Sequence, residues 1–118
     1  MNIDPKNSAN NNFIIHHEGS HTVLLPLTTI DKLAAELSLP RVDYIKMDIE
    51  GAEPNALEGG RATIARWKPR LSLSAYHEPD HVVRIPAIVR DIRKDYLMEC
   101  GPCEESNGRI HPDILYFR

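Results

Sequence analysis

Carboxylates and a glycine follow directly on a short apolar segment near the middle of the chain. They are Asp48, Glu50, Gly51 and Glu53, and the segment before them, 42–47, has the composition of a strand. In open α/β sheets, ligands bind just outside the carboxyl ends of the strands, so acidic side chains there are functional candidates. Such carboxylates can accept a proton from a hydroxyl group or hold a cationic group. The alternative is that Asp48 and Glu50 only cap a helix and solvate a turn.

A second group of candidates follows the next expected strand, 71–76. His77 comes at its end and is therefore expected at the same sheet edge as Asp48. A neutral imidazole in that position can serve as a general base. The alternative is a histidine that hydrogen-bonds a loop, and Tyr76 is more typical of packing than of ligand contact.

The motif Cys100-Gly101-Pro102-Cys103 has the residue pattern of a thioredoxin active site. That site needs a helix that begins at the first cysteine, because the helix N-terminus lowers the pKa of the thiol. Here the following residues, 104–108, form a polar stretch without helical periodicity, and the charge of Glu99 would raise a thiol pKa. A thiol oxidoreductase is therefore a minor alternative. A zinc site is equally weak, since only His111 is close in sequence.

Strands and helices are expected to alternate along the chain. Extended segments are expected at 23–27, 42–47, 71–76, 96–100 and 113–117, and helices at about 28–39, 54–68 and 80–94. The Gly59-Gly60 pair predicts a kink in the second helix, and Pro86 predicts a kink or a first turn in the third. This alternation predicts an α/β fold with a mostly parallel sheet, helices on its faces, and an antiparallel pair formed by the last two strands.

Length and composition indicate one domain. The chain has 118 residues, of which 42% are hydrophobic, and a net charge of −3 without a long run of like charge, which argues against nucleic-acid and membrane partners. No apolar stretch approaches the roughly 18 residues that a membrane span requires, and the N-terminal residues lack a signal-peptide pattern. We expect a cytoplasmic protein with a disordered or flexible leader at 1–21 and an α/β domain at 22–118.

Several ordered segments resemble one family of enzymes. They are TTIDKL at 28–33, DYIKMDIEGAE at 43–53, LEGG at 57–60, WKPRL at 67–71, AYH at 75–77, and HEPD at 77–80 followed by Ile85-Pro86. Together these segments resemble the C-terminal half of the FkbM-type S-adenosylmethionine-dependent methyltransferases. The expected order of elements is likewise similar to the second half of a Rossmann-like methyltransferase.

The resemblance implies S-adenosylmethionine as the methyl donor and a hydroxyl oxygen of a small-molecule or glycan-type compound as the acceptor. It implies catalytic roles for Asp48, Glu50 and His77, cofactor binding by Asp48, Glu50, Gly51 and Glu53, and substrate binding by Tyr76, His77 and Glu78. A divalent cation on these oxygens is a minor alternative, because two or three carboxylates without further ligands make a weak site; no metal is expected. The negative charge of Glu53 also interacts favourably with the positive N-terminus of the helix that begins there, which would stabilise the fold.

The family's glycine-rich cofactor turn is not found before residue 23, where Gly19 is the only glycine. Methyl transfer is therefore expected to be incomplete in this chain alone, and the alternative is a non-catalytic remnant or interaction module that has lost cofactor binding. Strand 42–47 would then lie at an open sheet edge, which invites pairing with another chain. We expect a homo-oligomer or association with a separate N-terminal half, unless 23–27 folds back along this edge.

Overall fold

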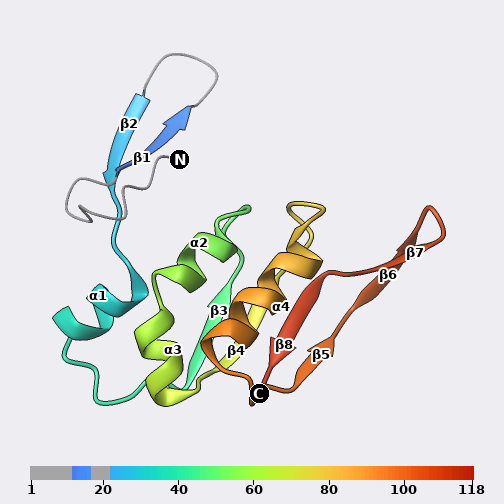
Figure 1. Ribbon diagram of the computed structural model, residues 1–118. Helices are drawn as coiled ribbons and strands as arrows, with labels where there is room; N and C mark the ends of the chain where they lie inside the picture. Colours follow the sequence, from blue (N-terminus) through green and yellow to red (C-terminus); the bar gives the residue numbers. More distant parts are fainter. Residues whose placement is uncertain (1–11, 17–21) are drawn as a thin grey trace.

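The computed structural model describes residues 12–16 and 22–118 (Figure 1). In chain order its elements are β1 (Asn12–His16), β2 (Thr22–Pro26), α1 (Ile30–Glu36), β3 (Tyr44–Met47), α2 (Glu53–Glu58), α3 (Arg61–Trp67), β4 (Arg70–Ser74), α4 (His81–Ile92), β5 (Met98–Cys100), β6 (Cys103–Ser106), β7 (Arg109–Pro112) and β8 (Ile114–Phe117). None of the helices in this described part of the chain has the length and apolar character needed to cross a membrane.

The predicted flexible leader falls mostly outside the described residues, since 1–11 and 17–21 are not among them. The described part of the leader is β1, which pairs antiparallel with β2 of the expected domain, and the two strands form a separate sheet. The segment 22–26 therefore pairs with β1 and does not fold back along β3, the alternative considered from the sequence.

The main sheet has four strands in the order β3-β4-β8-β5. Only β3 and β4 pair in parallel, whereas β8 is antiparallel to both of its neighbours, β4 and β5. The prediction of a mostly parallel sheet is therefore wrong. The physical reason is that three strands share one direction, as their helical crossovers require, but the single reversed strand β8 lies between two of them and creates two antiparallel ladders.

The antiparallel pairing of the two C-terminal strands is confirmed by the ladder between β5 and β8. Two details differ from the expectation. Strand β8 lies inside the sheet, so that β5 alone forms that edge, and the polar loop between these strands contains a second hairpin, β6–β7. Figure 1 shows this hairpin projecting beyond the end of the main sheet.

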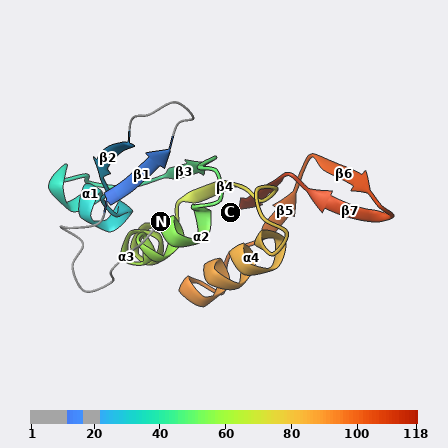
Figure 2. The same ribbon diagram turned by 90° about the horizontal axis from the view of Figure 1, so that it is seen from above.

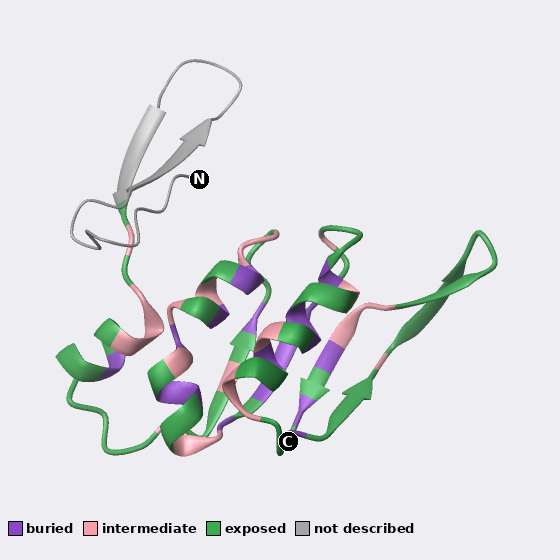
Figure 3. Cartoon of the chain, viewed as in Figure 1, coloured by how far each residue is buried: buried purple, intermediate pink, exposed green. Residues whose placement is uncertain are grey.

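The helices α2, α3 and α4 lie on the same face of the main sheet (Figures 1 and 2). The core lies between these helices and the sheet, and Figure 3 shows that the residues classed as buried lie in these helices and in the main strands. The largest fully buried members of the core are Phe117, Leu57, Ile64, Leu71, Leu73, Ile85 and Leu115. The opposite face presents Tyr44, at 56% exposed, and Tyr116, at 41%. Within the described residues, helices therefore cover only one face of the strand β3.

The described residues form four helices where three were expected, because the second expected helix breaks at Gly59-Gly60. The glycines allow a close approach: a Cβ atom on Gly59 would lie 3.1 Å from Cβ of Thr29, and one on Gly60 would lie 3.1 Å from Cδ1 of Ile30. Helix α1 thereby packs against the start of α3. Helix α4 runs through Pro86, so this proline does not mark the first turn of a shorter helix.

The open edge at β3 agrees with the expectation from the sequence, since β3 is a terminal strand of the main sheet. An unpaired edge strand exposes backbone donors and acceptors to a further strand. What pairs with it, whether a second copy or a separate N-terminal segment, stays a prediction.

Candidate functional site

The topology of β3 and β4 creates the candidate site. These neighbouring strands are parallel, so their carboxyl ends meet at one edge of the sheet, where Asp48 follows β3 and His77 follows β4. The connection from β3 to α2 turns sharply, with a φ of +56° at Glu50 and +99° at Gly51. Glycine adopts such a φ without steric penalty, whereas a glutamate does so rarely. Backbone strain of this kind is concentrated at functional sites.

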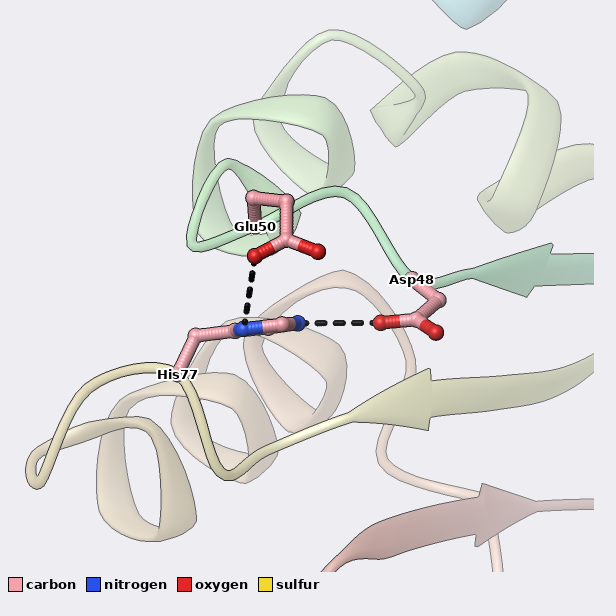
Figure 4. Close-up of side chains that lie close together, drawn as sticks. All are labelled: Asp48, Glu50 and His77. Carbon is pink, nitrogen blue, oxygen red and sulfur yellow. Dashed lines mark hydrogen bonds and ion pairs between the residues drawn. The ribbon is translucent and has the colours of Figure 1, made fainter.

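His77 lies between two carboxylates (Figure 4). Its Nε2 atom is 2.9 Å from Oδ1 of Asp48, and its Nδ1 atom is 3.5 Å from Oε2 of Glu50. The His77 side chain is 9% exposed, whereas that of Glu50 is 86% exposed. The hydrogen bond with Asp48 therefore holds a largely buried ring, although the Asp48 side chain itself is 47% exposed. Rotation of the exposed Glu50 can break the longer contact with Nδ1.

Asp48 also accepts a hydrogen bond from the hydroxyl group of Tyr76, at 3.1 Å. The hydrogen bond with His77 and, next to it, that from Tyr76 hold the pKa of Asp48 below its usual value. The same bond to Asp48 raises the pKa of the Tyr76 hydroxyl group, because it favours the protonated form. Asp48 is thus an ionised acceptor that two neighbouring side chains share.

Glu53 lies beside His77, with 3.6 Å between its Oε1 atom and Nε2 of the ring, and is fully buried. Its Oε1 atom accepts a hydrogen bond from the backbone N–H of Ile49 at 2.9 Å, and its Oε2 atom accepts one from Gly51 at 3.1 Å. These two bonds hold the strained turn in place. Cofactor binding by Glu53 stays a prediction, and its burial favours a supporting role.

Sequence reasoning missed His81, the first residue of α4. Its side chain is 2% exposed, and its Nδ1 atom lies 3.8 Å from Oε2 of Glu53. One feature of the sequence could have indicated this position. His81 follows His77 by four residues, so a helix that begins after the turn would place it near the same end of β4.

The remaining predicted residues also lie at this edge. A Cβ atom on Gly51 would be 3.8 Å from Cγ of Glu78 and 3.9 Å from Cβ of His77, so the two connections pack against each other. Tyr76 is 55% exposed, and Glu78 is exposed as well. The structure therefore brings all seven predicted site residues together, while their individual roles stay predictions.

The model of the methyltransferase FkbM domain family matches residues 2–101 of this chain. The chain belongs to the FkbM methyltransferase family. It is also similar to the crystal structure of methyltransferase FkbM from Methylobacillus flagellatus KT, with 28% sequence identity and a TM-score of 0.64. The match covers 93% of this chain but 26% of that one, so the chain spans about a quarter of that protein's length. A search of curated proteins gave no significant match.

A metal ion is the alternative to a hydrogen-bonded histidine at this candidate site. Asp48, Glu50 and His77 each offer a ligand atom, and these atoms lie within 4.8 Å of one another. The two carboxylates, however, lie at different nitrogens of the ring. Because a bound ion occupies the lone pair of an imidazole nitrogen, an ion at Nε2 of His77 would replace the hydrogen bond between His77 and Asp48.

The cysteine motif lies at the end of the region that the FkbM family model matches. Both Cys100 and Cys103 are free and exposed. Residues 103–106 form the strand β6, so the helix of a thioredoxin site does not follow the motif. The sequence-based argument against such a site is confirmed on this point.

Proposed function

We propose that this chain contributes to S-adenosylmethionine-dependent methylation of a hydroxyl oxygen, with the Asp48–His77 pair as its base. Membership of the FkbM family supports methyl transfer in general. The observation that carries the finer proposal is the hydrogen bond of 2.9 Å between His77 and Asp48 at the carboxyl ends of two parallel strands. Transfer to a hydroxyl oxygen requires that its proton leave, and a histidine oriented by a carboxylate is suited to take it.

The proposed base is the Nδ1 atom of His77. If Nε2–H donates to the ionised Asp48, the ring is held in the tautomer whose lone pair is on Nδ1. Rotation of the exposed Glu50 then gives an acceptor hydroxyl group access to this lone pair. After proton uptake the ring is positively charged, and the carboxylates of Asp48 and Glu50 stabilise that charge.

The residues at this edge fit the cationic part of the methyl donor. S-adenosylmethionine supplies an electrophilic methyl group on a sulfonium ion, and it also carries an ammonium group. The exposed carboxylates of Asp48 and Glu50 attract such charges, and the exposed ring of Tyr76 offers a π face to them. We place the methionine part beside these three residues and the acceptor between His77 and Glu78.

The test is a methyl-transfer assay of the chain in its homo-oligomer, or together with a separate N-terminal half, with isotope-labelled S-adenosylmethionine and a panel of hydroxyl, amine and thiol acceptors. The variant His77→Gln retains a donor for Asp48 but has no basic nitrogen, so we expect transfer to a hydroxyl acceptor to fall by at least about 100-fold. The matched control is His111→Gln, at an exposed position of β7, which should retain full activity. Undiminished transfer by the His77 variant, or labelling of amines alone, would refute the proposed role.

A further inference from the structure

Two buried ionisable side chains begin two neighbouring helices. Glu53 is the first residue of α2 and is fully buried, and His81 is the first residue of α4 and is 1% exposed. Their nearest atoms, Oε2 of Glu53 and Nδ1 of His81, are 3.8 Å apart. Within the described residues, Nδ1 of His81 is buried and has no hydrogen-bond partner.

A buried carboxylate needs more donors than the two backbone groups supply. Each carboxylate oxygen can accept two hydrogen bonds, and each oxygen of Glu53 accepts one from the turn, through Ile49 or Gly51. An uncompensated buried charge and an unpaired buried imidazole nitrogen are both unfavourable. A small rotation of His81 would satisfy both groups at once, provided that Nδ1 carries a proton.

We propose that His81 donates a hydrogen bond from Nδ1 to Glu53, and that this buried pair positions His77. The catalytic meaning of this positioning rests on the proposed function, whereas the hydrogen bond itself does not. Glu53 would then be a positioning residue, since it acts through the turn and through His77 and does not touch a ligand.

The pair affects His77 because Nε2 of His77 faces two carboxylates. It is 2.9 Å from Oδ1 of Asp48 and 3.6 Å from Oε1 of Glu53. When His81 and the two backbone groups satisfy Glu53, the proton on Nε2 goes to Asp48. Without His81, Glu53 competes for this proton, and the ring turns from the orientation that leaves Nδ1 open to a substrate.

The first test is the tautomer of His81 in the wild-type chain, read from the ¹H–¹⁵N correlation spectrum of its imidazole. We expect a protonated Nδ1. An unprotonated Nδ1 would overturn the proposal, because two acceptors would then face each other. This spectrum requires neither cofactor nor acceptor, so its outcome is independent of whether the chain transfers methyl groups.

The second test uses two substitutions that differ in the donor. His81→Asn places an amide N–H close to the position of Nδ1, whereas His81→Phe fills the space without a donor. We expect hydrogen exchange at the N–H groups of Ile49 and Gly51 to accelerate about tenfold in His81→Phe and to stay near the wild-type rate in His81→Asn. The ring signals of His77 should shift in His81→Phe and not in His81→Asn.

The control for general loss of stability is Ile64→Val, in the core on α3. It should leave exchange at the turn and the His77 signals unchanged. Equal behaviour of His81→Phe and His81→Asn would overturn the proposal. If His81→Phe does not fold, the wild-type tautomer and His81→Asn decide the question.

Discussion

The variant Asp48→Asn is expected to lower methyl transfer by at least about 100-fold while the fold is retained. The neutral amide removes the charge that stabilises a protonated His77. It can also present an oxygen or an N–H group to the ring, and with N–H it would favour the tautomer that has its proton on Nδ1. The measurement is the rate of labelled-methyl transfer, together with the imidazole tautomer of His77.

The matched control for this variant is Asp80→Asn. Asp80 is exposed at the start of α4 and its side chain makes no capping hydrogen bond there, so the substitution should leave the rate unchanged. The pH dependence of stability follows from the same contacts. Because hydrogen bonds lower the pKa of Asp48, ionised Asp48 stabilises the fold at pH values above its unfolded pKa, about 3.9. This stabilisation is lost as the pH falls through the lower folded value. Equal rates of methyl transfer by Asp48→Asn and Asp80→Asn would contradict the role of Asp48.

The variant Glu53→Ala is expected to lower the free energy of unfolding by about 2–4 kcal/mol. It removes the acceptor of the N–H groups of Ile49 and Gly51 and leaves a void beside His81 at the junction of α2 and α4. Such a loss is large for a single residue, because it combines two backbone donors left without their acceptor with a cavity. Chemical denaturation measures it directly.

Glu58→Ala is the control for the Glu53 substitution. Glu58 ends the same helix, its side chain is 51% exposed, and it forms a surface ion pair with Arg61. Exposed pairs of this kind contribute about 0–1 kcal/mol, so this variant should be nearly as stable as the wild type. Similar losses for both variants would contradict the buried role assigned to Glu53.

The meeting of the candidate site residues at one sheet edge could be predicted from the sequence because it depends on local patterns. An apolar strand that ends in Asp48 and Glu50, and a second strand that ends before His77, suffice to place these residues at one sheet edge when the two strands are parallel neighbours. The break at Gly59-Gly60 was likewise a local signal. These features require no knowledge of distant contacts.

The sheet order could not be predicted in the same way. The position of β8 between β4 and β5 depends on a pairing between segments far apart in the sequence, and the short polar stretch before it gave no indication of a hairpin. His81 escaped notice for a related reason. A histidine at the start of a helix is ordinarily a surface residue, and only the packing of α4 against α2 buries it beside Glu53.

Binding of the methyl donor at this sheet edge is tested by titration of the ¹⁵N-labelled chain with S-adenosylmethionine, followed by ¹H–¹⁵N spectra. The central claim is that the ends of β3 and β4 bind the methyl donor. We expect saturable shifts that concentrate at residues 48–53 and 76–78, with little change in the β6–β7 hairpin, and weaker binding by Asp48→Asn than by Asp80→Asn. No saturable shift in the folded wild-type chain, or shifts that concentrate elsewhere, would contradict this claim.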